Sequence, residues 1–314
     1  MKEKKIKVVP TDMKKRMSAL RRFLPYYVMF IPVVIYYAIF RYAPLIMSFV
    51  ISIIKYKPSK GILGSSFVGL KYYQEFISSV FFWRLIRNTL AINALQLTIG
   101  FVAPIILALM LNEVTHEKYK KLIQTVTYMP NFISTVVVVG MVVNFLSPSI
   151  GLINNILASF GFERKNFLAE PEYFWGIYMI MTIWQTAGYT AIIYLAALTG
   201  ISGELYEAAR IDGAGKWNQL IHITLPGLAD TIILMFLMKI GRIMDVGYET
   251  IILMYNPGIY STSDVIGTYV YRRGVQNGEY SFASAVGFFQ SVIGLVLVVL
   301  ANKISKKYSE ASLW

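Results

Sequence analysis

Six long apolar blocks limit what this chain can fold into. A helix needs about 20 apolar residues to cross the hydrocarbon core of a bilayer, and each block is long enough. Charged residues make up 15% of the chain, against about a quarter in a soluble domain. The sequence therefore predicts an all-α polytopic membrane protein with six transmembrane helices, and little chain remains for a separate soluble domain. The blocks cover approximately residues 25–54, 86–112, 123–146, 173–198, 229–255 and 282–302.

The distribution of positive charge predicts the orientation of the chain. The net charge is +13, and nine of the first 22 residues are Lys or Arg. Further lysines cluster at 116–121 and 302–307, which share a side with the N-terminus if six helices cross the bilayer. Because Lys and Arg are retained in cytoplasmic loops, we expect residues 1–24 to be a basic cytoplasmic tail and 303–314 a cytoplasmic C-terminal tail. The charge is assigned to this retention and to contact with membrane lipid, not to nucleic acid.

The sequence lacks the residues that several kinds of chemistry require. The chain has no cysteine, which excludes thiol catalysis, disulfides and thiolate metal sites. Its two histidines, His116 and His222, fall in predicted cytoplasmic loops, where solvated side chains are the ordinary interpretation. The stretch nearest to a phosphate-binding loop is RIDGAGKW, in which Arg210 replaces the first glycine and Trp217 the magnesium-binding hydroxyl. We therefore expect a protein that is not an enzyme and binds no cofactor or metal of its own.

A polar island, ELYEAARIDGAGKWNQLIHITLP at 204–226, separates two of the apolar blocks. Ser202 can cap a helix, Gly213 permits a sharp turn, and Pro226 suits the first turn of the next helix. The pattern predicts a short helix–turn–helix on the cytoplasmic side. One interpretation is a docking element for another protein, and the other is an ordinary loop between two membrane helices.

The island resembles the cytoplasmic signature of the permeases of binding-protein-dependent ABC importers. That signature is Glu-Ala-Ala, three residues, Gly, nine residues and Ile-x-Leu-Pro, and both spacings are intact. IDGAG is similar to the carbohydrate-uptake branch, and GYETIILMYNPGIYSTSDVIGTYVYRRG with the terminal SLW is similar to its LplB-like permeases. The island residues concerned are Glu207, Ala208, Ala209, Asp212, Gly213, Ile223, Leu225 and Pro226.

This resemblance implies a type I ABC importer permease fold in the bacterial cytoplasmic membrane. The transmembrane domain would cover 25–302, with its core at 86–302 and a coupling loop at 199–228. That loop would sit in a groove of a separate cytoplasmic ATPase dimer, which uses ATP and Mg²⁺. A second, different permease subunit, an extracytoplasmic solute-binding protein and a saccharide substrate, in particular an oligosaccharide, are the other partners that the resemblance implies.

Four polar or aromatic residues in the block at 173–198 are candidates for the substrate pathway, since polar groups at membrane depth are costly and usually functional. They are Trp184, Gln185, Thr186 and Tyr189. Aromatic faces stack on sugar rings, amides and hydroxyls pair with sugar hydroxyls, and Trp184 and Tyr189 can border one cavity. Helix packing and anchoring at the membrane interface are the alternative.

The block at 229–255 carries Lys239, Arg242, Asp245 and Glu249, spaced by three, three and four residues. In a continuous helix these side chains share one face, and a charged stripe must face water or the bundle interior. The stripe is expected either to line the substrate cavity or to form a structural network in which Arg242 pairs with Asp245. The charges differ from the amides expected around a neutral sugar, so a charged or amino-substituted oligosaccharide fits them.

Two other functions remain open from the sequence alone. An ion-coupled secondary transporter would use the charged face of the fifth helix as a relay, but it leaves the polar island unexplained and predicts inverted repeats with broken helices. A scaffold or sensor would dock some other protein through the island.

The segments outside the blocks carry three smaller expectations. Arg41, inside the first block, is expected near the outer interface, with its guanidinium among the head groups. The Gly- and Ser-rich outer loop at 56–76 predicts turns, with a short helix over LKYYQEFI. Apolar residues at helical spacing in 147–172 predict a helix that lies flat on the membrane.

Overall fold

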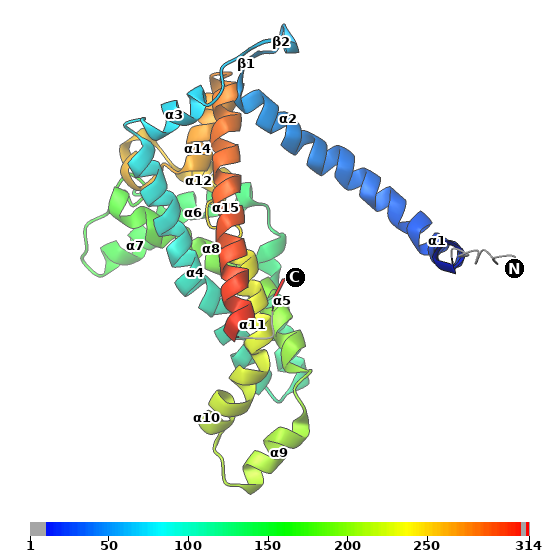
Figure 1. The fold of residues 1–314 in the computed structure, drawn as a ribbon. Coiled ribbons are helices and arrows are strands. Elements are labelled where there is room, and N and C mark those ends of the chain that lie inside the picture. The colour runs from blue at the N-terminus through cyan, green and yellow to red at the C-terminus, as the bar shows by residue number, and fades with distance from the viewer. Residues whose placement is uncertain (1–10, 309–311, 314) are drawn as a thin grey trace, which may run out of the picture.

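Helices lie side by side in an elongated bundle in the computed structural model, which describes residues 11–308 and 312–313 (Figure 1). Among these residues, four helical stretches are long and apolar enough to cross a membrane, and two bent helix pairs bring the possible spans to six. The predicted polytopic helical fold is confirmed. Residues 1–10, 309–311 and 314, which belong to the two predicted tails, lie outside the described residues. The four stretches are Phe23–Ser52, Phe82–Glu113, Lys216–Ile240 and Tyr280–Lys307.

The N-terminal helix leaves the bundle at an angle (Figure 1). Pro44 explains a π-helical turn within it, because proline lacks the N–H that would pair with the carbonyl of Phe40, and its ring clashes with that carbonyl. Near its end the helix packs on α15 (Tyr280–Tyr308), where the rings of Phe49 and Phe288 lie 5.0 Å apart. Side chains 23–47 are all exposed, so this apolar surface needs lipid or another protein against it. The helix consists of α1 (Thr11–Tyr37), η1 (Ala38–Tyr42) and α2 (Ala43–Ser52).

A small β-hairpin at one end of the bundle departs from the all-α prediction. β1 (Ile54–Lys57) pairs antiparallel with β2 (Gly61–Phe67), and Gly61 supplies the positive φ of 64° that the turn needs. The sequence of β2, GILGSSF, lacks the alternation of apolar residues that indicates a strand. The short helix predicted over LKYYQEFI is confirmed as α3 (Lys71–Ile77).

The helix predicted over 123–146 is broken. α5 (Glu117–Tyr128) and the 3-10 turn η2 (Met129–Phe132) are bent by 99° from α6 (Thr135–Leu146). Pro130 removes a backbone donor just before the bend, and the side chain of Ser134 accepts a hydrogen bond from the N–H of Val137 to begin α6. The helix expected within 147–172 is present as α7 (Leu152–Ser159).

The polar island connects two long helices at the end of the bundle opposite the hairpin (Figure 1). The predicted helix–turn–helix is confirmed, and its first helix is bent by 72° from the long helix that precedes it. In chain order the elements are α8 (Pro171–Leu198), α9 (Gly203–Ile211), α10 (Lys216–Gln219), the π turn η3 (Leu220–Thr224) and α11 (Leu225–Ile240).

The continuous helix predicted over 229–255 is wrong. α11 ends at the C-cap Gly241, and residues 241–247 form turns before α12 (Tyr248–Met254) begins. The break lies against α15, where a Cβ added to Gly294 would lie 2.9 Å from the carbonyl oxygen of Gly241. Two backbones therefore approach closely at the point where the helix stops.

The core lies between α4 (Phe82–Glu113) and α8, which pack along each other. Ala108 and Ala191 are fully buried at this contact and let the helices approach, while Tyr194 fills the space beside them. Short elements near the hairpin then lead from α12 back to α15. They are η4 (Pro257–Ile259), α13 (Tyr260–Ser263), α14 (Ile266–Val270) and the π turn η5 (Tyr271–Gln276).

Gly188 sets the approach of α8 to α5, because a Cβ there would lie 2.0 Å from the carbonyl oxygen of Thr127. We expect Gly188→Ala to force the helices apart and to lower the free energy of unfolding by about 1–3 kcal/mol. Thermal unfolding of the purified protein in detergent measures the loss. Gly176→Ala is the matched control on the same helix, since its Cβ would meet nothing within 4 Å. Equal melting temperatures of the two variants would contradict the role of Gly188.

Candidate functional site

The geometry of α9 follows from local capping. The side chain of Ser202 accepts a hydrogen bond from the N–H of Glu204 at 3.3 Å, which satisfies one free donor at the start of the helix. At the other end Gly213 has a φ of 78°, and the N–H of Ala214 reaches the carbonyl of Ala209 at 2.8 Å. The helix is thus closed at both ends by its own sequence, without help from the rest of the bundle.

The outer face of α9 is an exposed surface of mixed chemistry. Glu207, Ala208, Ile211 and Asp212 are all exposed and fall on one side of the helix, and we call them the docking surface. The side chain of Ile211 is 87% exposed, although a single helix at the tip of the bundle gives it nothing to pack on. Exposed apolar side chains among small and charged ones are typical of a surface that binds another protein.

Polar contacts tie the island to the bundle. The hydroxyls of Tyr206 and Thr224 lie 3.0 Å apart, and Nζ of Lys216 lies 2.5 Å from Oε2 of Glu113 at the end of α4. A cavity of about 450 Å³ lies among these residues. A force on α9 therefore reaches both α4 and α11.

The Ile-x-Leu-Pro end of the island shapes the connection to α11. Pro226 stands two residues after the π turn η3, as Pro44 stands two residues after η1, and the same missing N–H explains both turns. Ile223 and Leu225 are half-buried, whereas the docking surface is exposed. These residues thus set the direction of α11 relative to the island.

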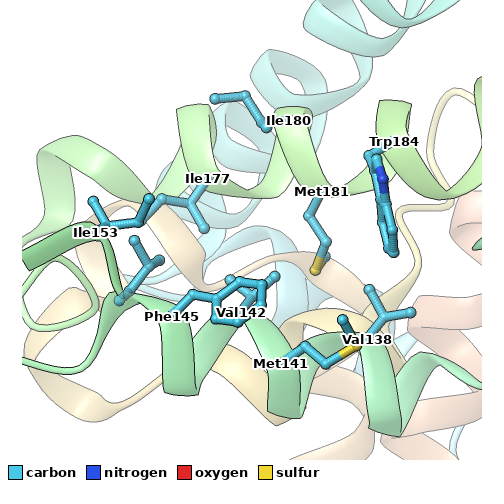
Figure 2. Close-up of a pocket in the computed structure, with 10 residues that line it drawn as sticks. Val138, Met141, Val142, Phe145, Ile153, Ile177, Ile180, Met181 and Trp184 are labelled. Atoms are coloured by element: carbon cyan, nitrogen blue, oxygen red, sulfur yellow. The ribbon is translucent and has the colours of Figure 1, made fainter. Parts of the chain in front are cut away.

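The four candidates on α8 do not gather in one cavity. Trp184 lines an apolar cavity of about 450 Å³ between α6 and α8, together with Val138, Met141 and Met181 (Figure 2). None of the side chains that line it is charged, an amide or a hydroxyl, so its surface suits an acyl chain or an apolar helix better than a sugar. Tyr189 lies elsewhere, with its ring 6.2 Å from that of Phe132.

The two candidates between them on α8 are used within the protein. Nε2 of Gln185 donates to the carbonyl of Ile133 at 3.2 Å, which holds the bend between α5 and α6. The hydroxyl of Thr186 donates to the carbonyl of Thr182 at 2.8 Å within its own helix. These contacts favour the packing interpretation for Gln185 and Thr186.

The expectation that Lys239, Arg242, Asp245 and Glu249 share one helix face is wrong, because α11 ends before Arg242. Nζ of Lys239 donates to the carbonyl of Gln96 at 3.0 Å, so this cation is satisfied by α4. Glu249 lies in the first turn of α12. Arg242 and Asp245 lie in the break, and within the described chain they form no ion pair with each other.

Arg242 and Asp245 instead line a polar cavity of about 550 Å³ between the break, α15 and the N-terminal helix. Arg41 also lines it, from η1, so its side chain faces this cavity within the protein. The sequence did contain a signal for Arg41, since it is the one charged residue between positions 25 and 54.

A buried ion network near the hairpin was not predicted. Asp264 is fully buried and accepts hydrogen bonds from Arg84 at 2.9 Å, Arg272 at 2.7 Å and Thr268 at 2.8 Å. Burial lowers the pKa of Arg272, but its hydrogen bonds with Tyr255 and Asp264 outweigh burial and hold that pKa above its ordinary value. The network fastens the connection between α12 and α15 to α4.

Comparison with known proteins gives consistent results for this chain. The model of the family "binding-protein-dependent transport system inner membrane component" matches residues 100–310. The polygalacturonan/rhamnogalacturonan transport system permease protein YteP of Bacillus subtilis (strain 168) is 42% identical over 288 residues, which cover 92% of this chain and 89% of that protein. Protein LplB of the same strain is 39% identical over 298 residues, covering 95% and 93%.

A solved structure has the same fold. It belongs to a bacterial ABC transporter involved in the import of the acidic polysaccharide alginate. The two chains superpose with a TM-score of 0.86 at 41% identity, and the match covers 94% of this chain and 100% of that one. The family predicted from the polar island is thereby confirmed.

Proposed function

Because the chain belongs to the family of binding-protein-dependent transport system inner membrane components and is a permease of an ABC importer of saccharides, we propose that its substrate is an acidic oligosaccharide. One observation carries the proposal. The chain is 41–42% identical, over more than nine-tenths of its length, to two transporter chains whose names specify polygalacturonan and alginate. Both of these polymers bear a carboxylate on their sugar units. The Arg41 and Arg242 cavity agrees with such a substrate.

The docking surface on α9 takes the cytoplasmic ATPase dimer, and that dimer binds ATP and Mg²⁺. This assignment places the α9 end of the bundle in the cytoplasm, with both termini on that side. The hairpin end then faces outward and receives the solute-binding protein that delivers the saccharide. The exposed apolar side chains of 23–47 and the apolar cavity beside Trp184 provide surfaces for lipid and for a second, different permease subunit.

ATP binding by the ATPase acts on the permease through α9. ATP closes the ATPase dimer, which moves α9, and the contacts of Tyr206 and Lys216 pass the movement to α11 and α4. The bundle switches from inward-facing to outward-facing and accepts the saccharide from the binding protein. Hydrolysis of ATP returns the bundle to the inward-facing state, because ATP stabilises only the outward-facing one.

An ion-coupled secondary transporter has less support. The broken helix that it would predict is present at 241–247, but the secondary transporter leaves the docking surface and the family match unexplained. The break is explained equally well as the wall of a saccharide cavity.

The test uses the permease co-expressed with its partner subunits, purified as a complex and reconstituted in liposomes with its binding protein. We expect oligogalacturonates or alginate oligosaccharides to raise ATP hydrolysis and to enter the liposomes, whereas neutral oligosaccharides of the same length do neither. Uptake of neutral sugars alone would overturn the acidic substrate. Purification without any ATPase would overturn the assignment of the docking surface.

A further inference from the structure

We propose that the polar cavity between η1, the break at 241–247 and α15 binds a carboxylate of the saccharide, with Arg41 and Arg242 as its cationic ligands. The inference rests on the proposed function and deepens it, since it names the residues that recognise an acidic sugar during transport. Asp245, Gln290 and Ser291 contribute further polar groups to the lining.

Arg41 and Arg242 are charges without a partner in the described structure. Neither guanidinium forms an ion pair or hydrogen bond with a described residue, and both are exposed to the cavity. Other cations of the chain do have partners, since Lys239 donates to the carbonyl of Gln96 and Arg272 pairs with Asp264. Unpaired arginines at membrane depth are costly, so their retention indicates a partner that comes from outside this chain.

The cavity lies part-way along two apolar helices that are long enough to cross a membrane. Arg41 precedes the end of α2 at Ser52 by eleven residues, and Gln290 follows the start of α15 at Tyr280 by ten. At about 1.5 Å per residue, both lie about 15 Å along their helices from the hairpin end, which is half of a hydrocarbon core about 30 Å thick.

Two irregularities of the backbone meet at this cavity. Arg41 stands in the π turn η1, and Arg242 stands directly after the end of α11. π turns occur frequently at functional sites, and interrupted helices near the midplane are typical of substrate sites in transporters. Gly287 of α15 also lines the cavity, and the space beside it is open, since a Cβ there would meet nothing within 4 Å. The backbone thus departs from regular α-helix at the two positions where the unpaired arginines lie.

The chemistry of the lining matches one uronate unit. Arg41, Arg242 and Asp245 leave a net charge of +1, which a single carboxylate neutralises. The planar guanidinium group binds a carboxylate through two parallel hydrogen bonds. Nε2 of Gln290 already donates to the carbonyl of Met244 at 2.7 Å, so its Oε1 remains to accept a hydrogen bond from a sugar hydroxyl. A neutral sugar would leave the positive charge uncompensated.

The experiment measures saccharide imported per ATP hydrolysed in the reconstituted complex, with an acidic oligosaccharide and saturating binding protein. Docking of the loaded binding protein stimulates hydrolysis, whereas the cavity is needed afterwards to receive the sugar. We therefore expect Arg242→Gln and Arg41→Gln to change stimulated hydrolysis by less than about twofold but to lower import per ATP about tenfold. Arg242→Lys, which keeps the charge, should recover part of this loss.

Lys239→Gln is the matched control, because it removes a cation three residues from Arg242 that is tied to α4 and does not line the cavity. It should leave import per ATP unchanged. If the Arg41 and Arg242 variants lose ATP hydrolysis and also lose the second permease on purification, the inference is overturned. The arginines would then pair with that subunit and not with the saccharide.

The wild-type complex separates failure of the inference from failure of the proposed function. If both arginine variants still import the acidic saccharide at the wild-type efficiency, the inference is overturned but the proposed function is not. Absence of uptake with every acidic saccharide in the wild type overturns the proposed function, and the inference with it.

Discussion

Asp264→Asn is expected to lower the stability of the folded permease by about 3–5 kcal/mol. The carboxylate of Asp264 has no exposed surface and holds Arg84 at 2.9 Å and Arg272 at 2.7 Å. Asparagine keeps the shape of the side chain but leaves two guanidinium groups, 31% and 21% exposed, without a counter-charge. The loss of charge-assisted hydrogen bonds then adds to the cost of burying unpaired cations. Thermal unfolding of the purified complex in detergent measures the effect.

The control for this prediction is Glu279→Gln. Glu279 pairs with Arg273, but these side chains are 39% and 26% exposed, and Arg273 keeps a second carboxylate, Glu75, at 2.9 Å. Surface pairs of this kind contribute about 0–1 kcal/mol, so the melting temperature should change little. If both variants melt at the same temperature as the wild type, the Asp264 network does not hold the connection between α12 and α15.

The long helices could be predicted because the bilayer imposes a local requirement on sequence. Hydrocarbon accepts only segments that satisfy their own backbone, so α4, α8 and α15 follow directly from the apolar blocks at 86–112, 173–198 and 282–302. The island could be predicted for a related reason. Ser202 and Gly213 act on their immediate neighbours, and such effects are visible in a short stretch of sequence.

The break after α11 could not be predicted in this way. Residues 241–247 contain two glycines and two charges, but the spacing of Arg242 and Asp245 by three residues also fits one face of a continuous helix. The break coincides with a close approach of Gly241 to Gly294 on α15, and these two glycines are far apart in sequence. The same limit applies to Asp264, whose partners Arg84 and Arg272 come from different parts of the chain.

The substrate residues show how helix geometry separates near neighbours. Trp184 and Tyr189 are five residues apart, and five residues turn an α-helix by about 140° past a full turn. The structure accordingly places Trp184 in an apolar cavity against α6 and Tyr189 against Phe132. Arg41 joins Arg242 because the N-terminal helix ends on α15, a contact between opposite ends of the sequence.

Glu207→Arg is expected to abolish coupling between this permease and its ATPase. Glu207 is an exposed residue of the docking surface, so its reversal perturbs nothing inside the bundle. In the complex the same change places a cation where the partner receives an anion, and like charges across an interface cost several kcal/mol. We expect the affinity for the ATPase to fall about a hundredfold, since each 1.4 kcal/mol is a factor of ten. Co-purification of the ATPase and sugar-stimulated ATP hydrolysis in liposomes measure the loss.

Glu117→Arg provides the control for net charge. Glu117 is exposed in the first turn of α5, outside the island, and its reversal costs that helix only about 0.3–1 kcal/mol through the dipole. If α9 is the coupling element, the Glu117 variant retains the ATPase and the Glu207 variant loses it, although both change the net charge equally. Equal loss in the two variants would mean that general electrostatic attraction, and not a specific contact, holds the ATPase. Retention of full activity in both would move the coupling contact away from α9 and toward α10, whose Lys216 contacts α4.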